Sequence, residues 1–353
     1  RARAWRKAQR ERYALLPGAL LPWYGENARA LPWREDREPY HIWLSEIMLQ
    51  QTRVEAVKAY YMRFLEAFPT IGALAGAEES RLMKLWEGLG YYSRARNLQR
   101  AAQRIVEHCG GTFPRSFAEI RALPGVGDYT AGAVASICYE EPAAAVDGNV
   151  LRVVARICDY HEPIGRPAFK KEVASALERV YPAGRCGDFT QSLMELGALV
   201  CLPDGAPKCG ECPAAAFCLA RQNGTAGMLP VRAQKAPRRK EKITVLLLRC
   251  AGCVAVEPRP ETGLLAGLWQ LPNLPGHLDE CAVLEWARAR DGAAKMIRTR
   301  PAKHVFTHIE WDMRCYELEC SRMFPPFTWA AQAQLEGEIA LPTAFRRCFP
   351  KQA

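Results

Sequence analysis

The chain of 353 residues has no long hydrophobic run, and its longest purely aliphatic stretch is Val245–Leu248. A helix needs roughly 20 apolar residues to cross a bilayer, so the sequence predicts no membrane association. The first dozen residues are rich in arginine and lack the apolar centre of a secretory signal. This argues against export but leaves a transit peptide open.

Acidic residues are in the minority, and no internal repeat is evident. The chain has 38 Asp and Glu against 48 Lys and Arg, with a pI near 9.0. A basic surplus favours a polyanionic partner such as nucleic acid, although many basic proteins bind none. The length and the 49% apolar content allow two or three compact cores.

The 14 cysteines lack the dense, even spread of a small secreted disulfide scaffold. Cys201, Cys209, Cys212 and Cys218 crowd into one segment, with seven, two and five residues between them. Four thiolates in so short a loop indicate metal ligation in a reducing compartment. The spacing suits a compact iron–sulfur cubane, with zinc as the alternative. A further pair, Cys250 and Cys253, flanks a glycine turn without a partner pair, and we interpret it as structural.

The pattern of apolar residues changes from helical to β-type about two thirds of the way along the chain. From Pro39 to about Ile157, apolar residues recur at spacings of three and four, which predicts helices. Residues 232–242 contain six basic residues, one acidic residue and a proline, as in a linker. Short β-type runs follow at residues 243–248 and 304–311, with one helical segment near residues 281–289. We therefore predict a mostly α region over residues 1–220, a basic linker over 221–241 and a smaller α/β domain over 242–353.

A glycine-rich turn, LPGVGD at residues 123–128, lies between two helical stretches. Gly125 and Gly127 permit a tight turn that exposes backbone N–H groups at the start of a helix near Tyr129. Such a helix start favours an anion, for example a DNA phosphate. Taken alone, the turn is more typical of an ordinary helix–helix connection.

Two carboxylates occupy chemically suggestive positions. Glu46 has Ile42, Trp43 and Leu49 three or four positions away in the helix predicted from Pro39. Loss of hydration there would raise its pKa and suit it to carry a proton. Asp147 stands at the entry of another helix, where an N-cap is the common role of aspartate. On its own, Glu46 is more typical of the edge of an amphipathic helix.

Five motifs, taken together, resemble the adenine DNA glycosylases of the MutY family in order and spacing. They are LPWR at residues 31–34, SEIMLQQTRV at 45–54, GLGYY at 88–92, LPGVGDYTAG at 123–132 and VDGN at 146–149. The similarity extends from about residue 20 to the end of the chain. It implies a helix-hairpin-helix glycosylase that flips adenine out of double-stranded DNA, opposite 8-oxoguanine or guanine, to reach the glycosidic bond.

The resemblance also implies roles for individual residues. Glu46 would protonate the adenine and Asp147 would stabilise the oxocarbenium-like sugar, as paired carboxylates do in sugar hydrolysis. Tyr129 and Asn149 would assist these two carboxylates. The remaining matches are Trp33, Arg34 and Gln191 in the adenine pocket; Gln51, Thr52, Tyr91, Gly125 and Gly127 at the DNA; and Phe306, Thr307 and His308 at the lesion.

Tyr129 separates this interpretation from the nearest alternative, a bifunctional glycosylase-lyase similar to endonuclease III. Enzymes of that kind carry lysine at this position, and the lysine forms a Schiff base that leads to strand cleavage. We therefore expect a monofunctional enzyme. A DNA-binding module without catalysis is a third possibility, which the presence of both Glu46 and Asp147 disfavours.

For the cysteines and the last domain, the resemblance implies a [4Fe–4S] cluster and a MutT-like (Nudix-like) recognition domain. The family pattern has six residues in the first cysteine interval, whereas this chain has seven. MutT-type hydrolases bind Mg²⁺ through a helix rich in glutamate, but here only Glu280 and Glu285 stand among Trp286, Arg288 and Arg290. We expect this domain to bind and not to hydrolyse. We also expect a monomer in the bacterial cytoplasm and nucleoid or, in a eukaryote, in the nucleus or mitochondrion.

Overall fold

The computed structural model describes residues 2–203, 206–233 and 236–350. The chain forms two compact units. Unit 1 comprises Arg1–Gly76 and Asn97–Gln234, and unit 2 comprises Ala77–Arg96 and Lys235–Ala353. The second division falls inside the segment predicted as a linker, and the boundaries of the predicted domains stay a prediction.

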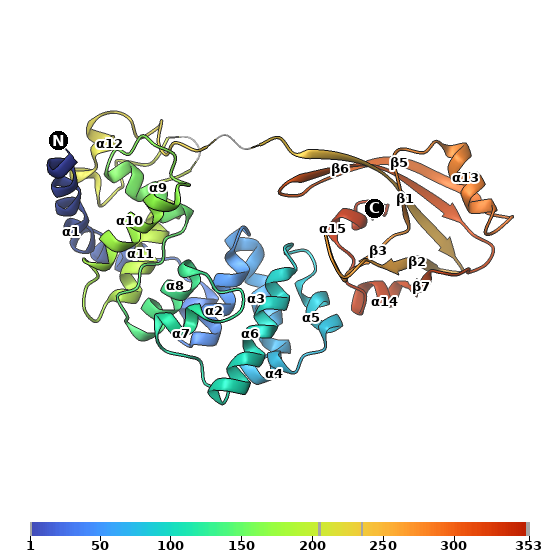
Figure 1. Ribbon diagram of the computed structural model, residues 1–353, viewed down its shortest axis with the longest axis horizontal. Coiled ribbons are helices and arrows are strands. Elements are labelled where there is room, and N and C mark those ends of the chain that lie inside the picture. Colours follow the sequence, from blue (N-terminus) through green and yellow to red (C-terminus); the bar gives the residue numbers. More distant parts are fainter. Residues whose placement is uncertain (1, 204–205, 234–235, 351–353) are drawn as a thin grey trace. The chain divides into compact units, whose positions relative to one another are not determined.

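Unit 1 is helical, as predicted (Figure 1). Its helices are α1 (Ala2–Asn27), α2 (Pro39–Leu49), α3 (Val54–Ala67), α4 (Ile71–Ala75), α7 (Phe117–Arg121), α8 (Asp128–Tyr139), α9 (Gly148–Ile157), α10 (Pro167–Glu178), α11 (Cys186–Leu199) and α12 (Leu219–Gln222). Short 3-10 helices lie at Pro32–Arg34 and Ala215–Phe217. Helix α6 (Ser93–Cys109) spans the division between the units.

The core of unit 1 is built around α9. Its apolar stripe of Val150, Val153, Val154 and Ile157 is buried together with residues of α1, α10 and α11. Each fully buried side chain of this size contributes about 1.5–3 kcal/mol relative to exposure. The stripe therefore fixes α9, and with it the residue that caps its start.

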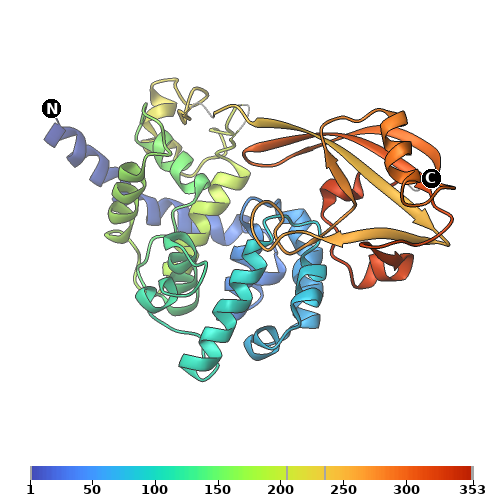
Figure 2. The ribbon, with the colours of Figure 1, turned by 45° about the vertical axis from the view of Figure 1, so that its right-hand side comes forward.

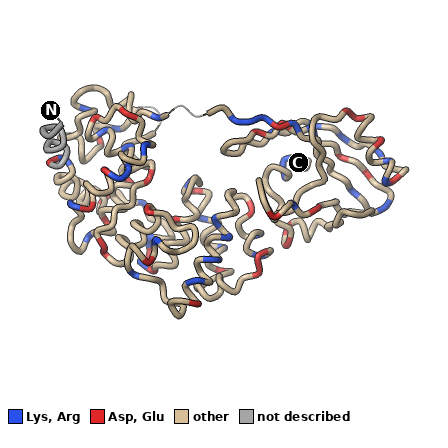
Figure 3. The backbone as a smooth tube through the Cα atoms, in the orientation of Figure 1, with Lys and Arg blue, Asp and Glu red and all other residues tan. Residues whose placement is uncertain are grey.

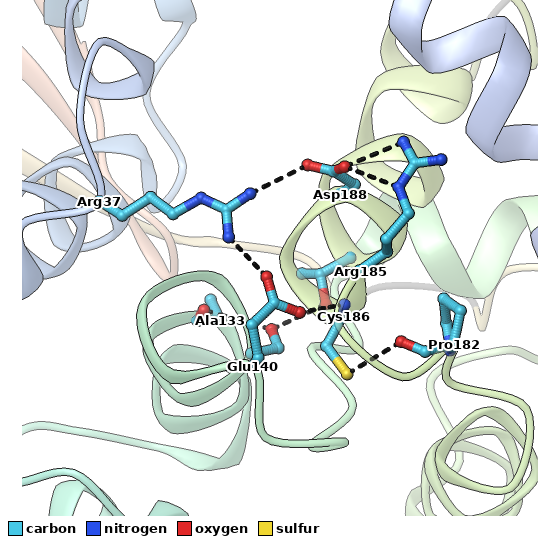
Figure 4. A network of polar contacts seen from close by, with 9 residues as sticks. Arg37, Ala133, Glu140, Pro182, Arg185, Cys186 and Asp188 are labelled. Carbon is cyan, nitrogen blue, oxygen red and sulfur yellow. Dashed lines mark hydrogen bonds and ion pairs between the residues drawn. The ribbon is translucent and has the colours of Figure 1, made fainter.

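A network of ion pairs joins three segments of unit 1 (Figure 4). Arg37, just before α2, contacts Glu140 at the end of α8 at 2.5 Å and Asp188 in α11 at 3.3 Å. Glu140 also accepts a hydrogen bond from the backbone N–H of Cys186, at the start of α11. The network therefore links the start of α2, the end of α8 and the first part of α11.

Unit 2 contains a mixed sheet, so the predicted α/β class is confirmed (Figures 1 and 2). Its strands are β1 (Arg239–Cys250), β2 (Cys253–Pro258), β3 (Trp269–Gln270), β4 (Asn273–Pro275), β5 (Lys295–Val305), β6 (Ile309–Glu319) and β7 (Thr328–Ala331). The main order is β3-β2-β1-β6-β5, in which β1 and β6 are parallel. Basic residues cluster at the start of β1 (Figure 3).

Helices cover both faces of this sheet. Helix α13 (Glu280–Arg288) buries Val283 and Ala287 against one face. On the other face, α14 (Gln332–Gly337) and α15 (Thr343–Arg346) bury Leu335 and Phe345. Helix α5 (Glu79–Trp86) also belongs to unit 2.

The β-type run predicted over residues 304–311 requires correction. Strand β5 ends at Val305, β6 begins at Ile309, and Phe306–His308 form the turn between them. The backbone N–H of Phe306 donates to the carbonyl of Ile309 at 2.8 Å. This turn contains neither glycine nor proline, so the local pattern gave no sign of it.

Two further features complete the fold. A disulfide joins Cys315 in β6 to Cys348 near the end of the chain, a pairing that the sequence analysis did not predict. Among the described residues, no helix combines the length and the apolar character that a membrane span requires.

Candidate active site

One pocket of unit 1 is lined by all the residues predicted for catalysis and adenine binding. It has about 770 Å³ of empty space, part of it open to solvent. Eight of the predicted residues line it: Trp33, Arg34, Glu46, Thr52, Tyr129, Asp147, Asn149 and Gln191. These residues come from α2, α8, α11, the start of α9, the 3-10 helix Pro32–Arg34 and the loop after α2, so several elements meet at this pocket.

Glu46 lies in the wall of this pocket, on the inner face of α2, and is 6% exposed. Burial raises its pKa to about 7, and the charge of Asp147 adds to the rise. A hydrogen bond from the hydroxyl of Tyr129 and the charge of Arg34 act in the opposite direction. A carboxyl group with a pKa near neutrality can deliver a proton as a general acid.

Asp147 caps the N-terminus of α9, as its position in the sequence predicts. One carboxylate oxygen accepts from the backbone N–H of Val150 at 2.7 Å, and the other accepts from Asn149 Nδ2 at 2.9 Å. Burial raises its pKa above the ordinary range, while both hydrogen bonds favour the charged form. The cap therefore orients the carboxylate of Asp147 at the pocket, and its hydrogen bonds favour the negatively charged form.

Glu195 is a pocket residue that sequence analysis missed. It is 0% exposed and accepts hydrogen bonds from Arg29 Nε at 2.7 Å and Arg34 Nη2 at 2.8 Å. Burial would raise its pKa, but the two arginines lower it to about 2. Glu195 thus holds Arg34 in place at the pocket. Its only signal in the sequence was a carboxylate inside the apolar stretch of α11.

A hydrogen-bonded chain leads from Asp147 toward the cysteines. Arg152 Nη2 donates to Asn149 Oδ1 at 2.8 Å, and Arg152 Nε donates to the carbonyl of Cys201 at 2.7 Å. One turn further along α9, Arg156 Nη1 lies 3.1 Å from Cys201 Sγ. Both arginines are buried, so α9 links the pocket directly to the cysteine loop.

The four predicted cysteines line one cavity, between α9, α11 and the loop that follows α11. Cys201, Cys209, Cys212 and Cys218 surround about 350 Å³ of empty space, part of it open to solvent. Burial raises the pKa of Cys212 to about 11, and the three other thiols contribute to the rise. In the described parts of the chain, no group of three or more His, Cys, Asp or Glu has the arrangement for holding a metal ion.

The glycine-rich turn joins α7 to α8, and its two glycines differ in backbone conformation and in the space around them. Gly125 has φ +73°, and a Cβ there would lie 2.5 Å from Asn97 Cβ. Only glycine fits such a position. Gly127 caps α8 with φ −99° and has open space around it. Both glycines are exposed and lie just before α8, and the N–H groups at the start of a helix favour an anion.

Gln51 and Tyr91 share an uncommon backbone conformation. Their φ angles are +58° and +48°, in the left-handed region that few residues other than glycine adopt. Residues held in this region often occupy functional sites. Gln51 is exposed in unit 1 beside Thr52, whereas Tyr91 belongs to unit 2 and is 45% exposed.

The three predicted lesion residues form the turn between β5 and β6. The ring of Phe306 packs on Trp311 with centroids 4.9 Å apart, while Thr307 and His308 are exposed. The hydroxyl groups of Thr307 and Tyr91 lie 2.9 Å apart in a hydrogen bond. Unit 2 therefore brings together two predicted DNA-facing residues that are 216 positions apart.

Comparison with known families identifies both parts of the chain. Residues 44–182 match the family described as HhH-GPD superfamily base excision DNA repair protein, and residues 244–351 match the NUDIX domain family. The chain is 32% identical to adenine DNA glycosylase from Homo sapiens, covering 94% of this chain and 73% of the human protein. It is 34% identical to adenine DNA glycosylase from Buchnera aphidicola subsp. Baizongia pistaciae, covering 82% of each.

Solved structures give a concordant picture of the helical part. A thermostable thymine-DNA glycosylase is 29% identical, with a TM-score of 0.54 over 60% of this chain and 98% of that one. Endonuclease III in a non-covalent complex with DNA is 24% identical, with a TM-score of 0.51 over 62% of this chain and 97% of that one, a likeness of fold alone.

Proposed function

The chain belongs to the adenine DNA glycosylase family of base excision repair enzymes, and we propose that its substrate is adenine opposite 8-oxoguanine or guanine in double-stranded DNA. The observation that carries this proposal is Glu46, a buried carboxyl with a pKa of about 7 in a pocket shared with Asp147. A base must leave the duplex to reach such a pocket, at a cost of a few kcal/mol.

In the proposed reaction, Glu46 donates its proton to the adenine ring, so that adenine leaves as a neutral base. Asp147, oriented by Val150 and Asn149, stabilises the positive charge that develops on the sugar. Water then adds to the sugar carbon from which adenine has left, and this completes the hydrolysis. The Tyr129 hydroxyl, hydrogen-bonded to Glu46, positions the acid. Trp33, Arg34 and Gln191 surround the base, and Glu195 keeps Arg34 directed there.

We also assign the DNA contacts by position. The turn with Gly125 and Gly127 would bind a phosphate, and Gln51, Thr52 and Tyr91 would enter the duplex beside the lesion. The turn of Phe306, Thr307 and His308 would contact 8-oxoguanine. The hydroxyl of Thr307 and the backbone of an exposed turn supply hydrogen-bonding groups for the base edge.

Cys201, Cys209, Cys212 and Cys218 are proposed to hold a [4Fe–4S] cluster. Four thiols around one cavity are the donor set that such a cluster takes. When bound, the cluster would supply a structural tie that fixes the cysteine loop. Arg152 and Arg156 already connect this loop to α9, whose first turn carries Asp147.

Single-turnover release of adenine from a duplex containing adenine opposite 8-oxoguanine tests the proposal. Loss of a general acid costs about 10²–10⁴-fold in rate, which is the reduction expected for Glu46→Gln. Glu107→Gln, on the exposed surface of α6, is the matched control and should behave as the parent does. No adenine release by the parent, or equal release by Glu46→Gln, would overturn the mechanism.

The same assay distinguishes the bifunctional alternative. Tyr129 has no amine with which to form a Schiff base, so the parent should release adenine and leave the strand intact. Products are compared with and without hot alkali. Abundant strand cleavage without alkali would favour an enzyme that acts as endonuclease III-like lyases do.

A further inference from the structure

Helix α5 and the turn after it pack with the C-terminal part of the chain. Residues 77–96 lie within the stretch that matches the helical glycosylase family, yet they form one unit with residues 235–353. This turn carries Tyr91, whose hydroxyl contacts Thr307. The contacts that join α5 to the C-terminal residues therefore bear on the position of Tyr91.

Three charged residues join α5 to α14 and α15. Lys84 Nζ donates to Glu87 Oε2 at 2.7 Å, to the carbonyl of Leu335 at 2.7 Å and to that of Ile339 at 3.1 Å. Arg346 Nε donates to Glu87 Oε1 at 2.6 Å, and its Nη2 donates to the carbonyl of Leu335 at 2.6 Å. We call Lys84, Glu87 and Arg346 the α5 lock.

The chemistry of the lock explains why it needs these residue types. The last carbonyls of a helix have no partner within the helix, and cations near them satisfy both their hydrogen bonds and their partial charge. Lys84 and Arg346 do this for the end of α14. Glu87 balances the two cations, and the side chains of Lys84 and Glu87 are each only 15% exposed. Water therefore screens this network less than it would a surface pair.

In the turn that follows the lock, Tyr91 has a strained backbone conformation and is held from several sides. Gly88, Gly90 and Tyr91 have φ angles of +100°, +70° and +48°. Trp86 Nε1 donates to the carbonyl of Gly90 at 3.0 Å, and the guanidinium of Arg94 lies 5.5 Å from the Tyr91 ring centroid. A strained conformation persists only where its surroundings over-determine it.

We propose that the Nudix-like part of unit 2 sets the position of Tyr91, through the α5 lock at the base of the turn and Thr307 at its tip. Arg346 is a positioning residue in this arrangement. The inference rests on the proposed function of Tyr91 and Thr307 at the lesion. It adds that discrimination of 8-oxoguanine from guanine depends on residues that do not contact the base.

The test combines a structural and a functional measurement on the full chain. In Arg346→Gln, we expect backbone amides of residues 87–94 to exchange hydrogen about tenfold faster, and the preference for adenine opposite 8-oxoguanine over adenine opposite guanine to fall about tenfold. Because a preference is a ratio of two rates on one preparation, partial inactivation by misfolding does not change it. Arg346→Lys keeps the ion pair with Glu87 and should restore part of both losses.

Arg322→Gln is the matched control, since Arg322 also donates to a backbone carbonyl in unit 2, that of Arg290 at 2.7 Å, but contacts no residue of the lock. It should change neither measurement. Glu87→Gln removes the charge from the other side of the lock and should act in the same direction as Arg346→Gln. Unchanged exchange at residues 87–94 in both lock variants, or faster exchange with an unchanged preference, would overturn the inference. A parent chain without any preference would instead refute the proposed lesion specificity, and the exchange data would still report on the lock.

Discussion

The two units differ in the burial of the carboxylates that are candidates for chemistry. In unit 1, Glu46 and Glu195 lie in a pocket wall and are 6% and 0% exposed. In unit 2, Glu280 and Glu285 of α13 are exposed. By resemblance, we expect α13 to correspond to the helix that binds metal in MutT-type hydrolases. Burial raises the pKa of a carboxyl group and also strengthens its interactions with nearby charges. We therefore propose that the chemistry belongs to unit 1, and we expect unit 2 to bind and not to hydrolyse.

The largest expected effect is in unit 1, at Glu195. Glu195→Gln leaves the guanidinium groups of Arg29 and Arg34 without their counter-charge in the pocket. Breaking a buried ion pair in this way costs about 3–5 kcal/mol in the free energy of unfolding. Urea unfolding measures the change. Glu79→Gln in unit 2 is the control, because Glu79 pairs with Arg96 but is 58% exposed, and such pairs contribute about 0–1 kcal/mol. Similar losses in both variants would contradict the contrast between the units.

The next effect is a pH dependence that originates at Glu46. Its pKa of about 7 lies above the ordinary value of 4.5, so between these values the folded chain holds a proton that the unfolded chain loses. The free energy of unfolding should therefore decrease as the pH rises through this window. Above pH of about 7, adenine release should fall toward tenfold per pH unit, since the acid is deprotonated. In Glu46→Gln both slopes should flatten, and a parent rate that stays constant from about pH 6 to 9 would refute the assignment.

A smaller effect separates the two glycines of the turn before α8. Gly125→Ala places a methyl group 2.5 Å from Asn97 Cβ at φ +73°, so we expect a loss of about 1–3 kcal/mol in stability and weaker DNA binding. Gly127→Ala meets open space at an ordinary φ and should change stability by about 1 kcal/mol or less. Thermal unfolding and a binding titration on duplex DNA check both. Equal destabilisation would show that the conformation at Gly125 is not the determinant.

The smallest effect is expected at α13. Replacing Glu280 and Glu285 together by glutamine should change adenine release by no more than about twofold, as surface substitutions do. Glu280 accepts a hydrogen bond from Thr299 at 2.8 Å, a structural contact at the edge of the sheet. The parent should also fail to hydrolyse nucleoside triphosphates when Mg²⁺ is added. Mg²⁺-dependent hydrolysis that disappears in the double variant would show that unit 2 is an enzyme in its own right.

Local patterns predicted much of the fold and of the candidate site. The spacing of apolar residues predicted α2, α9 and α13, and the position of Asp147 predicted its cap at α9. The prediction of one β-type run over residues 304–311 is wrong, because a turn without glycine or proline interrupts it. The resemblance to MutY supplied most of the pocket residues, but it did not supply Glu195, which only its contacts with Arg29 and Arg34 reveal.

Near neighbours and motifs in the sequence predicted most of the helical and strand segments, the four crowded cysteines and the pair of carboxylates. Which side chains lie within hydrogen-bonding distance of one another follows only from the tertiary structure. The hydrogen bonds of Tyr129 with Glu46, Arg29 with Glu195 and Tyr91 with Thr307 join residues 83, 166 and 216 positions apart. No local periodicity relates such residues, because their proximity follows from the packing of whole helices and strands. Burial in that packing is also what raises the pKa of Glu46 to about 7 and makes this carboxyl a candidate acid.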